Sequence, residues 1–438
     1  MQQKKTKKIH WAWSMYDWAN SAYNLVITST IFPIYYLSIT RHQIKDKQDY
    51  VSFFGWELIN SALLNYAIAF AYLIIAFLSP FLASLADHHG NKKKYMKFFT
   101  YLGSLSCILL YFFTPERVEL GIILAILAAI GYCGSLVFYN SYLPDIANDK
   151  EQDKLSARGF ALGYIGSVLL QVICLLFIFY PFTDETFAPR LSFLLVGIWW
   201  ISFAQISFYY LPDSQIREES TKTLGGFSEI KKVYKAIQRK AFMHRFLLAF
   251  FIYSMGVQTV MLAAAEFGAK EIRKFDGNDW VYLDPQDLII TILLIQLVAI
   301  AGAYLIAKAS SIWGNIKVLK TVVAVWFIVC ILAWFTYTNI HFYLLASLVG
   351  LIMGGIQSLS RSTYSKMVDN STLSSSYFSF YDLTEKVAIV IGMFSFALIE
   401  HISGKMRLSI IALAGFFLIG FILLQWAGKA KKPSINLH

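Results

Sequence analysis

The sequence has little charge and few cysteines. Only 15% of its 438 residues are charged, against about 25% in a typical soluble domain. So few charged residues leave too little polar surface for a water-soluble fold of this composition. Four cysteines disfavour a disulfide-stabilised scaffold. Each of them lies in an apolar run, where we expect a small buried side chain.

Sequence motifs of several enzyme classes are also missing. The chain has no His-Glu-x-x-His, no Gly-x-x-x-x-Gly-Lys-Ser/Thr, no Gly-x-Ser-x-Gly and no Cys/His group at metal-ligand spacing. Those patterns are typical of zinc peptidases, nucleotide-binding proteins, serine hydrolases and metal sites. We therefore expect no enzyme activity, no metal and no cofactor, and we expect any work to be driven by a gradient.

Hydrophobic residues, by contrast, make up 57% of the chain and aromatic residues 17%. This composition excludes a disordered protein, which has low hydrophobicity. The net charge of +11 falls in short basic runs between apolar segments, and no basic face interleaved with aromatic residues is present. The pattern predicts a lipid bilayer as partner and no nucleic acid.

Twelve apolar runs are long enough to cross a bilayer core of about 30 Å, which takes roughly 20 helical residues. Their predicted limits are 11–38, 60–86, 95–113, 118–141, 157–180, 191–211, 244–266, 287–308, 317–336, 341–363, 377–400 and 407–427. The first run follows a basic leader, as in a signal peptide. It is too long for one, contains Asp17 and Asn20, and lacks a small-residue cleavage site. We expect it to remain as the first span.

The distribution of basic residues predicts the orientation and the division of the chain. With the N-terminus taken as inside, 27 Lys and Arg residues fall on the inner side and 10 on the outer side. Both termini are therefore predicted to be cytoplasmic. The longest hydrophilic stretch, 212–243, separates an N-terminal six-helix bundle (1–211) from a C-terminal six-helix bundle (244–438).

The second part of this central loop has the pattern of an amphipathic helix. Apolar residues recur at helical spacing while lysines and arginines take the other positions. The apolar positions are Phe227, Ile230, Val233, Tyr234 and Ile237. We interpret the segment as a helix on the inner leaflet, and a regulatory or calmodulin-like target is the alternative interpretation.

A repeat supports the division into two halves. The loop after span two contains Gly90-Asn91, and the loop after span eight contains Gly314-Asn315, with matching Ala and Lys residues at an offset of 224. Matched loops in the two halves indicate parallel repeats. We therefore predict an all-α integral membrane protein with twelve transmembrane helices in two pseudo-symmetric six-helix bundles.

Polar residues inside the first span form the first candidate site. At about 100° per residue they share one narrow stripe, and the stripe consists of Asp17, Asn20, Ser21, Asn24 and Thr28. A charge at mid-bilayer costs at least about 2.5–3.5 kcal/mol, so this face must contact protein or water. A wall of a water-lined cavity and a polar seam between packed helices are the two interpretations.

Span eleven contains a second cluster, with Asp382, Glu385 and Lys386 on one side together with Ser375 and Ser379. The acid-first spacing of Asp382 and Lys386 favours an ion pair within the helix. This pairing leaves Glu385 without a local partner, and we place Asp17 within reach of Lys386 across a cavity.

Two further spans contribute polar candidates. Span ten has Gln357 and Arg361 on one face, behind glycines that permit close helix approach. Arg361 either extends to the headgroups or contacts an anionic solute or a gate. Span seven contributes Gln258. A buried carboxylate is the usual carrier of a coupled proton.

The loop between spans two and three resembles a hallmark of the major facilitator superfamily, Gly-x-x-x-Asp-x-x-Gly-x-Arg/Lys-Arg/Lys. The corresponding residues are Ala83, Asp87, Gly90, Lys92 and Lys93. The resemblance implies that Asp87 interacts with the N-terminus of span eleven and steadies the outward-open state, which the positive end of a helix dipole makes physically reasonable.

Residues 16–23, Tyr-Asp-Trp-Ala-Asn-Ser-Ala-Tyr, resemble the opening of the branch that contains the autophagy-related vacuolar amino-acid effluxers and their bacterial relatives. Segments 138–145, 158–164 and 354–362 agree with that branch in order. Asp382 and Glu385 depart from it, because small or neutral residues are expected there, and added charge can alter which solute binds.

The resemblance implies a secondary transporter of a small polar solute, an amino acid or short peptide, by alternating access in a bacterial inner membrane. Asp17 and Lys386 would bind the charges of a zwitterion, and Asn20, Asn24, Gln258 and Gln357 would complete its hydrogen bonds. Asp17 or Glu385 would carry a coupled proton. The alternatives are a sensor or scaffold that does not transport, and a facilitator for a sugar or organic acid.

Overall fold

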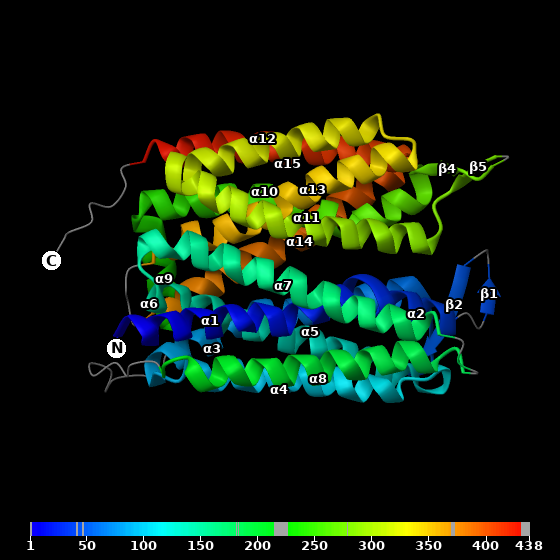
Figure 1. The fold of residues 1–438 in the computed structure, drawn as a ribbon, viewed down its shortest axis with the longest axis horizontal. Coiled ribbons are helices and arrows are strands. Elements are labelled where there is room, and N and C mark those ends of the chain that lie inside the picture. The colour runs from blue at the N-terminus through cyan, green and yellow to red at the C-terminus, as the bar shows by residue number, and fades with distance from the viewer. Residues whose placement is uncertain are drawn as a thin grey trace. The chain divides into compact units, whose positions relative to one another are not determined.

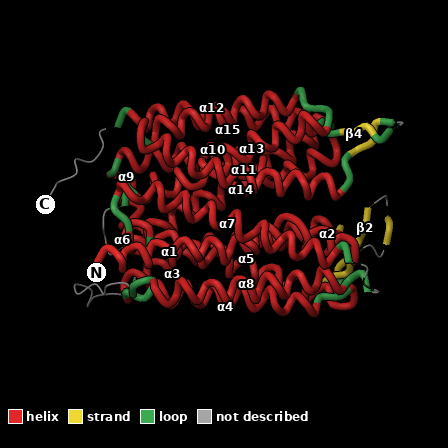
Figure 2. The backbone as a smooth tube through the Cα atoms, viewed as in Figure 1, coloured by secondary structure: helices red, strands yellow, loops and turns green. Residues whose placement is uncertain are grey.

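The computed structural model describes residues 2–40, 43–45, 48–180, 182, 184–213, 227–277, 279–368 and 373–430. Within these residues, twelve helical segments are long and apolar enough to cross a membrane. The predicted all-α fold with twelve spans is therefore confirmed. Figure 2 shows that strands occur only in short segments beyond the helix ends.

The chain forms two compact units. The first comprises Met1–Tyr142 and Leu162–Leu224, and the second comprises Leu143–Ala161 and Gly225–His438. The division at the central loop placed all of 143–161 in the N-terminal bundle, whereas the structure groups this segment with the second unit. The physical reason is a set of polar contacts between 149–161 and the helices of the second unit, described below.

The first unit contains the first four spans, the sixth span and most of the fifth (Figure 1). Its elements are α1 (Gln2–Ala22), η1 (Tyr23–Thr30), α2 (Ile31–Ile39), β1 (Gln43–Lys45), β2 (Gln48–Phe53), β3 (Trp56–Ile59), α3 (Asn60–His89), α4 (Lys92–Leu109), η2 (Leu110–Phe112), η3 (Pro115–Arg117), α5 (Val118–Ser141), α8 (Phe187–Tyr210) and α7 (Asp149–Ile178) from Leu162 onward.

The second unit contains the last six spans and the start of the fifth. Its elements are α6 (Leu143–Ile146), α7 up to Ala161, α9 (Phe227–Arg239), α10 (Ala241–Glu271), β4 (Arg273–Phe275), β5 (Trp280–Tyr282), α11 (Pro285–Trp313), α12 (Asn315–Trp334), α13 (Asn339–Ser365), α14 (Ser374–Ser403) and α15 (Met406–Gly428).

Local sequence explains where several helices begin and end. Asp284 caps α11 through a reciprocal pair of hydrogen bonds with Asp287, and Pro285 occupies the first helical position, where it is best tolerated. Gly90 ends α3 with φ +60°, a left-handed conformation that glycine adopts without a steric penalty. Gly404 ends α14 in the same way, with φ +64°.

The first span is not a regular α-helix, which corrects the stripe predicted from 100° spacing. Residues Tyr23–Thr30 form a π-helix. The Thr30 hydroxyl donates to the Leu25 carbonyl (2.7 Å) and the Ser29 hydroxyl donates to the Asn24 carbonyl (2.9 Å), each five residues back. These bonds support the wider turn, so the spacing of 100° per residue that predicted the stripe does not hold from Tyr23 onward.

Two small antiparallel sheets follow the first and seventh spans and had no counterpart in the sequence analysis. In the first unit, β1, β2 and β3 form one sheet in which Val51 pairs with Leu58. Its two-residue turn at Phe54 and Gly55 has positive φ at both positions, as a tight hairpin requires. In the second unit, β4 pairs with β5, and Arg273 lies opposite Tyr282.

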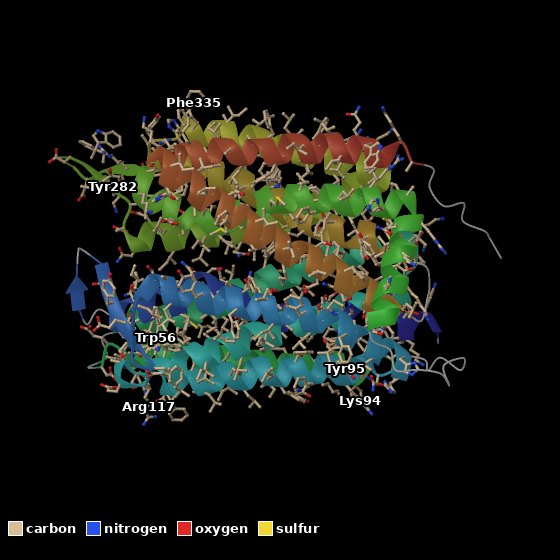
Figure 3. The ribbon with its side chains drawn as sticks, turned by 180° about the vertical axis from the view of Figure 1, so that it is seen from behind. Trp56, Lys94, Tyr95, Arg117, Tyr282 and Phe335 are labelled. Atoms are coloured by element: carbon tan, nitrogen blue, oxygen red, sulfur yellow. The ribbon has the colours of Figure 1, made fainter. Side chains whose placement is uncertain are left out.

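Figure 3 places Trp56 and Arg117 at one end of the first unit, and Lys94 and Tyr95 at the other. Glycines allow close helix packing in both units. A Cβ on Gly131 of α5 would collide with the backbone of Gly103 on α4, and one on Gly302 of α11 would collide with the Leu351 carbonyl of α13. Gly350 approaches Ile295 in the same region, so the predicted packing role of the span-ten glycines is confirmed there.

Candidate functional site

Asp17 lies inside the first unit. Its side chain is 5% exposed, and its Oδ2 accepts a hydrogen bond of 2.8 Å from the Tyr139 hydroxyl of α5. Tyr139 is itself held by Trp13, whose indole nitrogen donates to the Tyr139 carbonyl (3.0 Å) and whose ring stacks on the tyrosine ring. The carboxylate is therefore oriented by a fixed donor and is largely buried within the protein.

Asn20, one turn after Asp17, is 1% exposed. Its Oδ1 accepts a bond of 3.4 Å from the Ser21 hydroxyl, while its Nδ2 has no partner among the described residues. A buried unsatisfied donor costs about 1–3 kcal/mol. Ser21 packs so closely on Gly163 of α7 that a Cβ at Gly163 would collide with its hydroxyl. Part of the stripe therefore does act as a packed seam between helices.

Asn24 and Thr28 are half-buried, and the π-helix that contains them is fixed to α7. The Thr30 hydroxyl lies 2.9 Å from Gln171 Oε1. Gln171 is fully buried, and its Nε2 has no partner among the described residues. The polar spacing does not predict the π-helix. The consecutive hydroxyl residues Ser29 and Thr30, which stabilise it, are the sequence feature that relates to it.

Asp382, Glu385 and Lys386 come together in the second unit, as predicted. The Lys386 ammonium lies 3.5 Å from Asp382 Oδ1 and 3.9 Å from Glu385 Oε2. Asp382 and Lys386 are 4% and 6% exposed. The second oxygen of Asp382 has no hydrogen-bond partner among the described residues. Two carboxylates therefore share one ammonium, an arrangement that favours exchange of a proton or a cationic group.

Glu385 has a hydrogen-bond partner on a different helix. The Gln258 amide of α10 donates a hydrogen bond of 2.8 Å to Glu385 Oε1. Two predicted site residues from separate spans are therefore in contact. The Gln357 amide of α13 lies 3.5 Å from the sulfur of Met261, which follows Gln258 by about one turn of α10.

Arg361 is buried, with only 3% exposed, so its side chain does not extend to the headgroups. Its Nε donates to Ser156 Oγ (2.9 Å) and its Nη2 to the Ser156 carbonyl (3.0 Å). The guanidinium also lies 4.2 Å from the centre of the Phe160 ring. Arg361 therefore attaches the start of α7 to α13 within the second unit.

Sequence reasoning missed a polar network beside Arg361. Lys366 Nζ lies 2.6 Å from Asp153 Oδ2, and the Asn315 amide donates to Asp153 Oδ1 (2.9 Å) and to Thr363 Oγ1 (2.9 Å). Ser310 adds a bond of 3.3 Å to the same aspartate. The repeated Gly-Asn pair at 314–315 was the signal that marked this loop.

The motif between spans two and three joins helix ends of the first unit. Lys92 is buried, with its ammonium 4.4 Å from the centre of the Tyr142 ring, and Lys93 lies 3.1 Å from Asp213. Asp87 is 6% exposed. Its interaction with span eleven stays a prediction.

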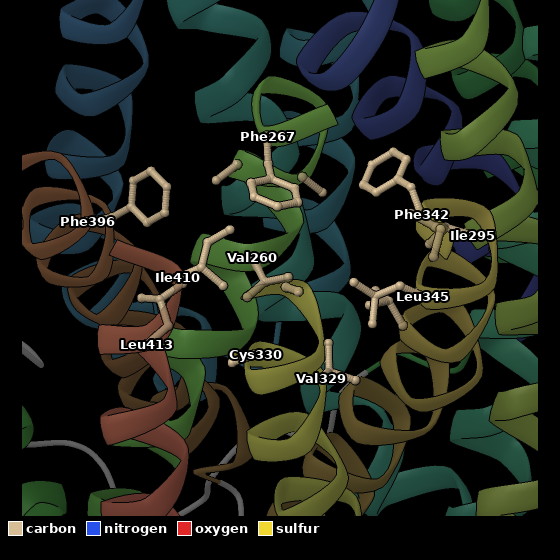
Figure 4. A pocket seen from close by; sticks show the side chains of 15 residues that line it. Val260, Phe267, Ile295, Val329, Cys330, Phe342, Leu345, Phe396, Ile410 and Leu413 are labelled. Carbon is tan, nitrogen blue, oxygen red and sulfur yellow. The ribbon is translucent and has the colours of Figure 1, made fainter. Parts of the chain in front are cut away.

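A pocket lies within the second unit, but it contains none of the predicted site residues (Figure 4). Val260, Phe267 and Leu413 are among its lining residues, all of which are apolar. It offers a polar solute no side-chain hydrogen bond. Within the described ranges, no group of three or more His, Cys, Asp or Glu side chains is arranged to hold a metal ion.

Comparisons with known proteins agree with this architecture. The sequence profile of the family described as "Vacuole effluxer Atg22 like" matches residues 5–434. The MFS-type transporter YxiO of Bacillus subtilis is 30% identical over 443 residues, covering 100% of this chain and 98% of YxiO. Autophagy-related protein 22-1 of Penicillium rubens is 22% identical over 479 residues, covering 88% of this chain and 79% of that protein.

Solved structures show the same fold. The major facilitator transporter FucP in its outward conformation aligns with a TM-score of 0.71 at 13% identity, covering 98% of this chain and 99% of FucP. The proton:xylose symporter XylE aligns with a TM-score of 0.73 at 12% identity, covering 97% of this chain and 96% of XylE. At these identities the likeness concerns the fold alone.

Proposed function

We propose that this chain, which belongs to the Atg22-like family of major facilitator transporters, moves an amino acid or short peptide across a membrane by alternating access. The observation that carries the proposal is the buried charge of α14. Asp382 and Lys386 lie inside a helix long and apolar enough to span a membrane. Charges there are costly, so a role in solute or ion movement is the default interpretation.

The family description names a vacuole effluxer, which supports the movement of a solute out of a compartment. The amino-acid class is what the resemblance of residues 16–23 implies. A zwitterionic solute needs an anionic and a cationic partner. We propose Asp17 as a partner for an ammonium group of the solute and Lys386 as a partner for a carboxylate. Asn20 and Asn24 of the first unit and Gln258 and Gln357 of the second would supply hydrogen bonds.

Lys386 is the residue whose pairing must change for this to work. In the structure it is shared by Asp382 and Glu385. A solute carboxylate would compete with these two acids for the ammonium, and a proton on one acid would make that exchange easier. We therefore propose Glu385 as the proton carrier, with Asp17 as the alternative carrier.

We further propose a location in a bacterial inner membrane with both termini cytoplasmic. The excess of Lys and Arg in the predicted inner segments supports this orientation. The motif at Asp87, Gly90, Lys92 and Lys93 would then lie on the cytoplasmic side and act in gating. Arg361, bonded to Ser156, would act there as a positioning residue instead of a solute contact.

A ligand screen tests the proposed substrate class. A ligand that binds the native state raises the melting temperature of the detergent-solubilised protein by mass action. We expect a rise with one or more amino acids or dipeptides and none with sugars or organic acids. A rise only with sugars or organic acids would assign a different solute class. Retention of substrate specificity without flux in proteoliposomes would indicate a sensor.

A further inference from the structure

The helix α9 is docked onto the second unit by its apolar face. Val233 and Ile237 are each 2% exposed. The ring of Tyr234 stacks on Phe380 of α14, with centroids 6.1 Å apart. Lys240, directly after α9, has its ammonium 5.6 Å from the centre of the Tyr377 ring, also on α14. Val233 and Ile237 are thus covered by protein, whereas Tyr234 stays 48% exposed.

The opposite face of α9 is basic and exposed. It carries Lys231, Lys232, Lys235 and Arg239. At about 100° per residue these four side chains occupy an arc of about 100°, opposite Val233 and Ile237. No carboxylate of the described residues forms an ion pair with any of the four. We call these four residues the basic face.

The helix α9 lies where the sequence predicts a membrane surface. The helix lies at the end of the second unit opposite β4 and β5, immediately before α10 enters its span (Figure 1). Figure 3 shows it, in green, running crosswise to α10. With the orientation predicted from the basic residues, that surface is the anionic cytoplasmic leaflet.

We propose that the basic face binds the anionic headgroups of phospholipids in the adjacent leaflet. The attachment is mainly electrostatic, because Val233 and Ile237 of the apolar face are already buried against the second unit. Each cation near an anionic surface contributes about a fivefold change in affinity, so the four together contribute about 10²–10³. Salt weakens the attachment strongly.

The docking contacts give this binding a route to the charged cluster. Tyr377 and Phe380 lie on the first two turns of α14, and Asp382, Glu385 and Lys386 follow on the same helix. Anionic lipid stabilises docked α9 and thereby holds this end of α14 in place. The regulatory part of the inference rests on the proposed transport function: flux is faster in anionic than in zwitterionic membranes.

Lipid titration tests the binding without any assumption about transport. Phosphatidylglycerol is added to the detergent-solubilised full-length protein, and the rise in melting temperature gives an apparent affinity. The variant K231Q/K232Q/K235Q/R239Q binds phosphatidylglycerol about 10²–10³-fold more weakly than the wild type. The matched variant R117Q/K270Q/R273Q/K405Q removes four exposed cations from the predicted outer side and keeps this affinity within a factor of ten of the wild type. Equal losses in both variants would overturn the assignment to α9.

Soluble anions distinguish the source of the negative charge. Inorganic phosphate and poly-glutamate at matched charge give less than a tenth of the lipid response. An equal response to poly-glutamate would assign the face to an acidic protein partner and overturn the lipid proposal.

Flux in vesicles tests the regulatory part. Tyr234→Ala removes the stack on Phe380 but leaves the basic face, so it binds phosphatidylglycerol like the wild type while flux no longer depends on the lipid. Lipid-dependent flux that survives in this variant would overturn the coupling through α14. Absence of flux in every vesicle, with lipid affinity intact, would refute the transport function and leave the lipid site standing.

Discussion

Gln258 and Glu385 are hydrogen-bonded across two helices, with the glutamine amide 2.8 Å from Glu385 Oε1. This bond connects α10 with the helix that carries the ion pair of Asp382 and Lys386. It gives Glu385 a neutral donor in addition to the ammonium, 3.9 Å away. A carboxylate between a neutral donor and a shared cation can gain or lose a proton without leaving a buried charge wholly uncompensated.

The first prediction concerns this carboxylate. Glu385→Gln keeps a group able to bond with Gln258 but cannot ionise, so accumulation driven by a pH gradient should stop while exchange of solute at equal pH continues. Uptake and counterflow in proteoliposomes separate the two. Glu400→Gln on the same helix is the control, because Glu400 pairs only peripherally with Lys270 (3.5 Å). Undiminished accumulation in Glu385→Gln would remove Glu385 as the carrier.

The second prediction concerns Arg361. Arg361→Gln loses the two bonds to Ser156 and the stacking on Phe160. We expect a loss of about 1–3 kcal/mol in stability. Because the same bonds attach the start of α7 to α13, protease access or hydrogen exchange at 149–161 should increase together with this loss. The exposed Lys317→Gln is the control. Unchanged exchange at 149–161 would show that Arg361 does not hold this segment.

Helix packing gives the third prediction. Gly302→Ala would force a methyl group into the Leu351 carbonyl on α13, where backbone cannot yield cheaply. The expected cost is about 1–3 kcal/mol, measured as a lower melting temperature in detergent. Gly415→Ala on α15 is the matched control, because nothing lies within 4 Å of the added carbon. Equal melting temperatures for the two variants would contradict the close approach of α11 and α13.

A fourth prediction concerns pH at the hairpin of β4 and β5. Hydrogen bonding to Lys274 lowers the pKa of Asp284 below its ordinary 3.8, and bonds to Asp284 and Asp287 raise the pKa of Lys274 above 10.5. The contribution of ionised Asp284 to the stability of the hairpin is complete above pH 3.8, and it is lost as the pH falls through the lowered pKa of this group. The contribution of charged Lys274 to the same stability is complete below pH 10.5, and it is lost as the pH rises through the raised pKa of this group.

The order of the hairpin should therefore be constant between about pH 4 and pH 10 and decrease outside this window. Fluorescence of the exposed Trp280 on β5, compared with a Lys274→Gln variant, would report the change. In that variant the capping bonds between Asp284 and Asp287 remain, while the alkaline decrease disappears. An alkaline decrease of the same size in Lys274→Gln would rule out this lysine as its cause.

Hydropathy was sufficient to predict the twelve spans, because the cost of exposing polar backbone to lipid leaves helices as the available structure. Both Gly-Asn pairs lie at the junctions of consecutive helices, and the parallel repeat that they indicate stays a prediction. The π-helix at 23–30 was beyond reach, since it depends on Ser29 and Thr30 bonding backward and on Gln171 of another helix. Periodicity describes one helix at a time and contains no information about such contacts.

The same limit applies to the contacts of the candidate site. Within α14 the pairing of Asp382 with Lys386 followed from their spacing, whereas the partner of Glu385 belongs to α10 and the partner of Arg361 to α7. The segment 143–161 was assigned to the N-terminal bundle by chain order. Asp153 accepts a hydrogen bond from Asn315, and Ser156 donates one to the Ser358 carbonyl, so the segment belongs with the second unit.

The most direct measurement is the flux of a solute, identified by the ligand screen, through proteoliposomes containing Asp17→Asn. Tyr139 can still bond to the asparagine oxygen, so the fold should persist while the negative charge is lost. We predict at least a tenfold decrease in flux, equivalent to about 1.4 kcal/mol, with an unchanged melting temperature. Asp279→Asn, at the exposed hairpin, should leave flux unchanged. Full flux in folded Asp17→Asn would contradict the claim that the buried charges of the spans bind the transported solute.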